Sequence, residues 1–357
     1  MVVIILGMHF TKWKSAVPVF ILILVSCSLP INVATAIPRE QSPSITNLPA
    51  PVAPEKVVTQ TIPAPTITIP WYSHPDNDPG LLGRSYGLLE ISQAHIYETL
   101  EDATNATEHF RLAPKPPAYL AYDQTRTLNG RVYVHLTDGG WMSREELTPV
   151  VVTTFSGLIF SGIPPYPFGW FLRDATGWTD SSASQSSGLV HHRYEVATIL
   201  GQVGGWVQLV SNDWVSLSDL ALIDPNKIRT PSSTCRWMDV DLTSQTLVAF
   251  DNCQPVFATL ISSAKAPAVT PTGTFTIFYM EEKLPLFANE RVAGDENFYQ
   301  ADVPWLMFFH ENWAIHGAYW HDHFGEPWSH GCINVSPYDA FWLYQWSKLG
   351  DMIVVHE

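Results

Sequence analysis

Between about residues 77 and 231, short runs of β-branched and aromatic residues alternate with turn-forming residues. The run Arg131–Leu136 is soon followed by two glycines, and Trp206–Val210 is followed by an Asn-Asp pair. Valine, tyrosine and tryptophan suit a pleated surface, whereas Gly, Asn and Asp favour tight turns. This alternation restricts the region to small all-β units.

A weak internal repeat indicates that there are two such units. The motif Gly-Trp-Met-Ser at 140–143 recurs as Asp-Trp-Val-Ser at 213–216, with a spacing of 73 residues. Each copy is followed by an acidic residue and a leucine, at 146–147 and 219–220. The spacing is close to the length of one small β-barrel, so we predict units at 77–150 and 151–231.

The second copy, from Arg193 to Leu222, resembles the bacterial SH3-like modules that accompany many cell-wall enzymes. The resemblance implies that the unit binds the wall or positions substrate. A purely structural support is the alternative.

The first 36 residues have the features of an export signal. Two lysines precede an apolar run, Ala16–Val25, which is too short to span a bilayer comfortably. Ala34–Ala36 fits the small-x-small cleavage pattern, whereas Leu24–Cys27 resembles a lipobox in which Cys27 is lipidated. Both alternatives predict an exported protein, whose contact with a membrane is limited to the signal or a lipid anchor.

Residues 37–76 are rich in Pro, Thr, Ser and Ala. Such a segment cannot bury enough apolar surface to fold, and its prolines keep the backbone extended. We interpret it as a disordered spacer ahead of the folded units.

The chain of 357 residues has a formal net charge of -15 and a hydrophobic content of 46%. The hydrophobic content is sufficient for several small cores. The negative charge excludes nucleic acid as a partner, because phosphates require a basic surface.

A third segment, 232–357, opens with a predicted hairpin. If Thr243–Gln245 form its loop, Val240 lies opposite Val248 on an apolar face. The same register sets Cys235 opposite Cys253, and an oxidising compartment favours a disulfide between them. Two unpaired thiols are the alternative.

Cys332 has the surroundings of a reactive thiol. A thiol is a useful nucleophile only as its thiolate, so it needs a base or a positive potential nearby. His316 and His330 lie close to Cys332 in the sequence. Gly331 lets the backbone approach a substrate carbonyl, as an oxyanion hole of amide N–H groups requires.

A helix is predicted directly after this cysteine. Ser336 is its N-cap, Pro337 its first residue, and Asp339 stands three residues after the cap. We expect the helix to run through Lys348 and to stop at Gly350. Its positive end should favour the thiolate modestly.

The stretch Ser329-His330-Gly331-Cys332-Ile333-Asn334, which follows His316, resembles the signature of the L,D-transpeptidase (YkuD-type) catalytic domain. That signature is a histidine, a spacer of about fifteen residues and then Ser/Thr-His-Gly-Cys-x-Asn/Arg. His316 and Cys332 are sixteen residues apart, and Thr270–Phe275 matches a second recurring element, Thr-Pro-x-Gly-x-Phe. The likeness covers about 236–355 and implies a β-sandwich with a short helix after the cysteine.

The resemblance implies that His316, oriented by the carbonyl of Gly317, removes the proton of Cys332. The thiolate would attack the carbonyl that joins an L-centre to D-alanine in a peptidoglycan stem peptide, with amides near Gly331 and Cys332 stabilising the oxyanion. An amine of a second stem peptide would resolve the thioester and form a cross-link. His330, Ser329 and Asn334 would shape the loop.

Further implications concern partners. Donor and acceptor stem peptides are the expected substrates, carbapenem-type compounds the expected inhibitors, and no cofactor is implied. Resolution of the thioester by water would instead give an L,D-carboxypeptidase. Tyr299 and Tyr319 are weak candidates for an additional oxyanion donor.

Two other classes of function compete with this interpretation. Five side chains could ligate a metal, namely His316, His321, His323, His330 and Cys332, although paired short cysteine spacings are absent. The second competitor is a non-catalytic wall-binding protein built on the SH3-like unit.

Overall fold

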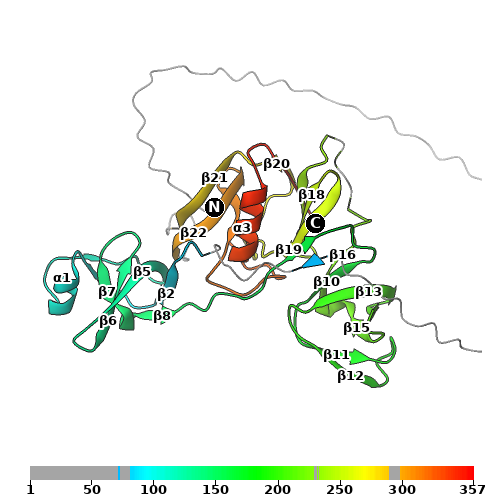
Figure 1. Ribbon diagram of the computed structural model, residues 1–357, viewed down its shortest axis with the longest axis horizontal. Coiled ribbons are helices and arrows are strands. Elements are labelled where there is room, and N and C mark those ends of the chain that lie inside the picture. The colour runs from blue at the N-terminus through cyan, green and yellow to red at the C-terminus, as the bar shows by residue number, and fades with distance from the viewer. Residues whose placement is uncertain (1–70, 73–80, 229–230, 232, 289–297) are drawn as a thin grey trace, which may run out of the picture. The chain divides into compact units, whose positions relative to one another are not determined.

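The computed structural model describes residues 71–72, 81–228, 231, 233–288 and 298–357 (Figure 1). The predicted signal, Cys27 and most of the predicted spacer lie outside the described residues. Strands dominate the described part, so the predicted mainly-β class is confirmed. None of the helices in these ranges is long and apolar enough to cross a membrane.

The first β unit surrounds its own apolar core. Its strands are β2 (Ser85–Leu89), β3 (His95–Tyr97), β4 (Phe110–Leu112), β5 (Ala118–Leu128), β6 (Arg131–Leu136), β7 (Trp141–Ser143) and β8 (Leu147–Pro149), with helix α1 (Leu100–Asn105). Asn129 and Gly130, both at positive φ, form the two-residue turn between β5 and β6. Buried residues such as Leu89, Val134 and Met142 fill the core.

The second β unit is built in the same way. Its strands are β10 (Phe168–Phe171), β11 (Ala175–Trp178), β12 (Ser186–His191), β13 (Val196–Val203), β14 (Trp206–Leu209), β15 (Trp214–Ser216) and β16 (Leu220–Ile223). Phe171, Ile199, Val207 and Val215 are buried at its centre.

The predicted repeat has a structural counterpart. In the first unit β7 leads through the 3-10 turn Arg144–Glu146 into β8, and in the second β15 leads through Leu217–Asp219 into β16. The repeated serine caps each turn, because Ser143 Oγ accepts from Glu145 N and Ser216 Oγ from Ser218 N, each at 3.3 Å. The likeness to SH3-like modules stays a prediction.

The boundary at 151 differs from the structure in one respect. Strand β9 (Leu158–Phe160) lies within the range predicted for the second unit, but it pairs with β19 of the C-terminal domain and with β1 (Trp71–Tyr72). Leu158 and Phe160 are buried in the same apolar cluster as Trp237 and Phe250, which explains why this strand joins that sheet.

The C-terminal domain is a sandwich of two sheets with one helix. One sheet holds β17 (Trp237–Asp241), β18 (Thr246–Asp251), β19 (Gln254–Leu260), β20 (Gly273–Thr276) and β25 (Met352–His356). The other holds β21 (Tyr279–Ala288), β22 (Phe298–His310), β23 (Trp313–Gly317) and β24 (Ile333–Val335). Met238 and Phe257 of the first sheet and Ile315 and Ile333 of the second share one buried cluster with Leu343 of helix α3 (Pro337–Trp346).

The predicted register of the β17–β18 hairpin is wrong by one residue. Val240 pairs with Leu247, whereas Val248 pairs with Asp239. The prediction assumed one apolar face, but both faces of this hairpin are buried. Met238 and Val240 enter the sandwich core, and Val248 packs in the cluster shared with the second β unit. A strand that is buried on both sides carries no alternation from which to read a register.

Cys235 and Cys253 are joined in a disulfide. Cys253 lies outside the β17–β18 ladder, in the two-residue turn Asn252–Cys253 that links β18 to β19. Both turn residues have positive φ, which is typical of a type I′ turn. Because the turn lies beyond the paired residues, the one-residue error in register does not prevent this pairing.

Helix α3 begins as predicted, with Ser336 Oγ accepting from Asp339 N at 3.2 Å and Pro337 in the first turn. Its predicted end is wrong, because the helix stops at Trp346 rather than Lys348. The amide of Lys348 donates to a carboxylate oxygen of Asp351 at 3.0 Å, which turns the chain away from the helix axis.

Candidate functional site

Strands β23 and β24 bring His316 and Cys332 to one side of a sheet. The two strands run parallel, with Ile315 opposite Ile333 and His316 opposite Asn334. Side chains alternate along a strand. Ile315 and Ile333 therefore enter the sandwich core, while His316, Asn334 and Cys332 face the other side.

The thiol and the imidazole are both buried. Cys332 is 5% exposed and His316 is 2% exposed. Burial raises the pKa of the Cys332 thiol to about 11, and burial lowers the pKa of His316 to about 4. At neutral pH the thiol and the imidazole are therefore both uncharged.

Burial disfavours the thiolate in this resting state, because it raises the pKa of Cys332. A helix terminus contributes only about 0.3 to 1 kcal/mol. The modest contribution expected from the end of the following helix stays a prediction.

One nitrogen of His316 is oriented by the backbone. Nδ1 lies 3.3 Å from the carbonyl oxygen of Gly317, as the resemblance implies. Since Nδ1–H donates to this carbonyl, Nε2 keeps a lone pair that can accept a proton. A Cβ at Gly317 would lie 3.0 Å from Cα of Pro337, so glycine permits the close approach of α3 to β23.

The loop before Cys332 is held by hydroxyl groups. Ser329 Oγ donates to the carbonyl of Cys332 at 2.6 Å and accepts from Gly331 N at 3.1 Å. Thr270 Oγ1 donates to the carbonyl of Gly331 at 2.8 Å and accepts from Ala264 N at 2.9 Å. The amide of Gly331, which we expected to line an oxyanion hole, is therefore engaged within the loop.

Gly331 and Thr270 each explain part of a motif. Gly331 has φ +143°, and a Cβ there would lie 2.5 Å from Nε1 of Trp313, so only glycine fits. Thr270 is the first residue of the Thr-Pro-x-Gly-x-Phe element, for which no role could be predicted from the sequence. Its hydroxyl ties that element to the cysteine loop.

Tyr319 shares a buried apolar cluster with Cys332, and Tyr299 packs against that cluster. The ring of His330 is exposed and packs on Phe298, with 4.8 Å between ring centroids. The hydroxyl of Tyr319 donates to Ala301 O at 2.5 Å, and its ring stacks on Tyr86. Burial raises the pKa of Tyr299 to about 12.

The histidines between His316 and the cysteine have separate partners. His321 is mostly buried, and burial lowers its pKa to about 3. The ring of His323 stacks on Trp328, with 3.8 Å between ring centroids. Within the described residues, no group of three or more His, Cys, Asp and Glu side chains is arranged to hold a metal ion.

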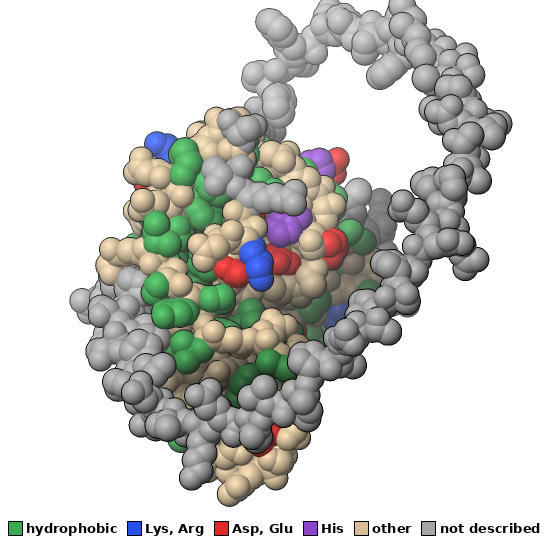
Figure 2. Space-filling model, turned by 90° about the vertical axis from the view of Figure 1, so that its right-hand side faces the viewer, with side chains coloured by type: hydrophobic (Ala, Val, Ile, Leu, Met, Phe, Trp, Pro, Cys, Tyr) green, Lys and Arg blue, Asp and Glu red, His purple; other side chains and the backbone are tan. Residues whose placement is uncertain are grey.

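A cavity of about 890 Å³ lies away from this centre, between β13 of the second unit and strands β17 and β25. Ile199, Leu222, Asp239 and His356 are among its lining residues, and neither His316 nor Cys332 is. Figure 2 views the molecule from the side on which β18 lies in Figure 1, and on it charged and histidine side chains gather among hydrophobic ones. Since neither His316 nor Cys332 lines this cavity, it is separate from the centre that the sequence motif indicates.

Comparisons with known proteins concern the C-terminal domain. Residues 236–355 match YkuD, the family model of the L,D-transpeptidase catalytic domain. No curated protein matches the chain.

Several solved structures are similar to part of the chain. An L,D-transpeptidase (Yku) from Stackebrandtia nassauensis is 25% identical, with a TM-score of 0.30, over 37% of this chain and 60% of that chain. One from Mycobacterium smegmatis is 19% identical, with a TM-score of 0.32, over 41% of this chain and 72% of that one. The catalytic domain of the E. faecium L,D-transpeptidase is 24% identical, with a TM-score of 0.31, over 35% of this chain and 100% of the domain.

Proposed function

We propose that the C-terminal domain, which matches the L,D-transpeptidase catalytic domain at residues 236–355, cross-links peptidoglycan stem peptides through a thioester at Cys332. His316 is the base. The observation that carries this proposal is the parallel pairing of His316 with Asn334, which sets the imidazole and the thiol on one face of the sheet.

The first half-reaction follows from the uncharged resting pair. The Cys332 thiol gives its proton to Nε2 of His316 while sulfur attacks the carbonyl carbon between an L-centre and D-alanine. His316 then gives this proton to the departing D-alanine nitrogen as the amide bond breaks. The product is a thioester on Cys332.

The second half-reaction returns the enzyme to its starting state. The amine of an acceptor stem peptide attacks the thioester carbonyl, and His316 takes a proton from the attacking nitrogen. The carbon–sulfur bond breaks, and the sulfur recovers a proton from His316. A new amide cross-link results.

Proton transfer and attack are expected to occur together. Burial raises the pKa of the Cys332 thiol and lowers the pKa of His316. Both shifts disfavour a thiolate–imidazolium pair that forms before the attack. Attack on the carbonyl spreads the negative charge from sulfur to oxygen and avoids forming this pair.

The cellular site is proposed on the sequence of residues 1–36 alone. Its signal features favour an exported protein that acts at the cell wall. Export would also suit the disulfide between Cys235 and Cys253.

The reaction can be tested with the chain from residue 37 onward, a tetrapeptide donor ending in D-alanine and an acceptor stem peptide. Mass spectrometry of the products should detect a cross-linked dimer and free D-alanine. Cys332→Ala and His316→Gln should abolish both, whereas His323→Ala should not. Trimmed donor without dimer would identify a carboxypeptidase, and product from Cys332→Ala would refute the proposal.

A further inference from the structure

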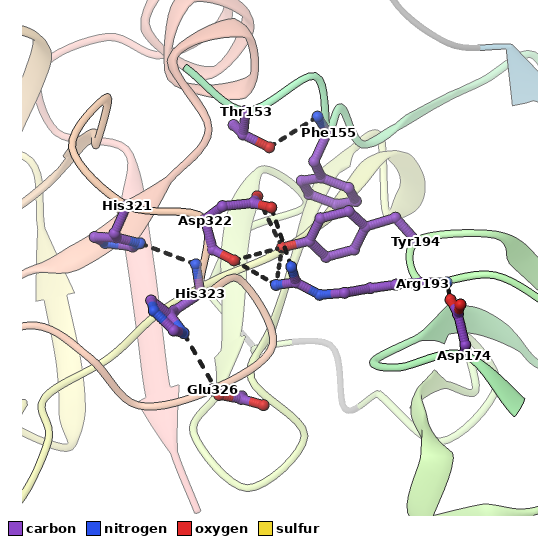
Figure 3. A network of polar contacts seen from close by, with 9 residues as sticks. All are labelled: Thr153, Phe155, Asp174, Arg193, Tyr194, His321, Asp322, His323 and Glu326. Carbon is purple, nitrogen blue, oxygen red and sulfur yellow. Dashed lines mark hydrogen bonds and ion pairs between the residues drawn. The ribbon is translucent and has the colours of Figure 1, made fainter. Parts of the chain in front are cut away.

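Side chains of the second β unit form hydrogen bonds with the loop between β23 and Cys332 (Figure 3). Arg193 Nη1 donates to Asp322 Oδ2 at 3.0 Å, and Arg193 Nη2 donates to the backbone carbonyl of Asp322. The hydroxyl of Tyr194 lies 3.1 Å from the same carbonyl and 3.0 Å from Asp322 Oδ1. Both the side chain and the backbone of Asp322 are thus fixed from another unit.

This contact restrains geometry more than it stabilises the fold. The side chains of Arg193 and Asp322 are 35% and 45% exposed, and exposed ion pairs contribute little to stability. The guanidinium is held in place because it lies 4.2 Å from the ring centre of Tyr194, which packs on Phe155. The bond to the carbonyl of Asp322 immobilises the main chain between His321 and His323.

The next contact fixes the proton on His321. The backbone N–H of His323 donates to Nδ1 of His321 at 3.1 Å, so Nδ1 carries a lone pair. The proton of the uncharged ring must then reside on Nε2, which becomes a donor.

The donor role of Nε2 determines how Asn334 is turned. As placed, Nδ2 of Asn334 lies 3.0 Å from Nε2 of His321, which would set two donors against each other. Exchanging the carboxamide oxygen and nitrogen removes the conflict, since the oxygen then accepts from His321. The amide nitrogen moves to the buried position of Oδ1, an atom to which no group of the described residues donates.

The amide nitrogen of Asn334 then lies next to the proposed reacting groups. Asn334 is 3% exposed, pairs directly with His316, and is two residues from Cys332 on the same face. Its backbone is fixed on the other side by hydrogen bonds to and from Ser262. Since the Gly331 amide is already engaged with Ser329, a carbonyl oxygen of the substrate would find an available donor here.

We propose that Arg193 is a positioning residue for the reacting centre. It holds Asp322, the loop holds His321, and His321 turns Asn334 so that its amide donor is presented to the substrate carbonyl between His316 and Cys332. This inference rests on the proposed function and gives the second β unit a defined part in it.

The first arm of the test does not depend on activity. Nitrogen NMR of the histidine-labelled chain from residue 37 should find His321 with its proton on Nε2. Arg193→Ala and Asn334→Ala should each shift this signal or speed the exchange of its proton. Arg173→Ala, an exposed arginine of the same unit, and His323→Ala, which keeps the backbone donor, should leave the signal unchanged.

The second arm measures acylation of Cys332 by a carbapenem. Arg193→Ala should lower the limiting acylation rate about tenfold, as small misplacements of reacting groups do, and change the apparent binding constant less than twofold. Arg193→Lys should recover part of the rate. Asn334→Ala should lower the rate at least as much, and the double variant should be no slower than Asn334→Ala.

The two arms separate the inference from the function it rests on. If the wild-type protein is not acylated, the proposed function fails, while the NMR arm still decides whether Arg193 controls His321 and Asn334. The inference is overturned if Arg193→Ala leaves the His321 signal unchanged. Fully additive rate losses in the double variant would also overturn it.

Discussion

The two β units share a local motif but meet the C-terminal domain in different ways. The first extends a sheet of the domain, because β5 pairs in parallel with β22, and Tyr86 stacks on Tyr319 with 3.6 Å between ring centroids. The second shares an apolar core with the other sheet and adds the polar contact of Arg193 with Asp322.

The repeat therefore determines the local fold of each unit but not how that unit packs against the C-terminal domain. The repeated Trp-x-Ser motif forms the strand and the capped 3-10 turn in both copies. The docking residues lie outside it, with Tyr86 on β2 of the first unit and Trp170 on β10 of the second. The same turn is therefore kept in two units that pack differently against the C-terminal domain.

The largest effect is expected at the shared core of the second unit. Trp170 is 1% exposed and packs in one cluster with Trp237 and Phe250. Trp170→Ala should lower the free energy of unfolding by about 3 to 5 kcal/mol, because it leaves a large cavity. Denaturant titration measures this, with exposed Val203→Ala as the control. A loss below about 1 kcal/mol would mean that the second unit is not part of a common core.

The packing of the first unit on the C-terminal domain should depend most on the Tyr86 ring, which lies in the buried cluster that the two share. Tyr86→Ala should cost about 3 kcal/mol, since it removes a buried ring from the face of Tyr319. Tyr86→Phe keeps the stack and loses the 3.3 Å bond to Asp302 O, so it should cost about 1 kcal/mol. Equal losses in the two variants, by denaturant titration, would show that the hydroxyl and not the ring secures this unit.

The linker between the units gives a pH-dependent effect. Asp339 accepts from Gly157 N at 2.8 Å and from Thr259 Oγ1 at 2.6 Å, and burial raises its pKa from 3.8 to about 6. The folded state then binds more protons than the unfolded state between about pH 4 and 6. Stability therefore increases as pH falls, by about 1 kcal/mol between pH 7 and 5.

The matched variant for this effect is Asp339→Asn, which has no proton to bind. Denaturant titrations at pH 7 and pH 5 should give a smaller gain in stability for the variant than for the wild type. An identical gain in both proteins would assign the pH dependence to other groups.

The smallest effect should be the same in both units. Ser143→Ala and Ser216→Ala each remove one capping hydrogen bond at the same place in the repeat. Each should cost about 0.5 kcal/mol, the low end for a helix cap. Thermal denaturation of the two variants would contradict the structural equivalence of the repeats if the costs differed by more than about 1 kcal/mol.

Features determined by local sequence could be predicted. The start of α3 follows from Ser336 and Pro337. The motif that contains His316 and Cys332 lies in the domain that matches the family model, and the roles of the two residues stay a prediction. The repeated turns likewise depend on residues that are adjacent in the chain.

Features determined by burial could not be predicted. No sequence pattern in Leu158–Phe160 predicts that this strand pairs with β19. The register of the β17–β18 hairpin could not be predicted because β17 is buried on both faces. The same holds at the site, where the burial that raises the pKa of Cys332 depends on the tertiary fold. The hydrogen bond from Arg193 to Asp322 joins residues that are 129 positions apart in the sequence. No local sequence pattern extends over such a separation.

The central claim is that Cys332 is the nucleophile of a transpeptidase-type centre. Incubation of the chain from residue 37 with a carbapenem, followed by intact mass, tests it most directly, with Cys332→Ala as the control. The account predicts one adduct on the wild-type protein and none on the variant. No adduct on folded wild-type protein, or an adduct that persists in Cys332→Ala, would contradict it.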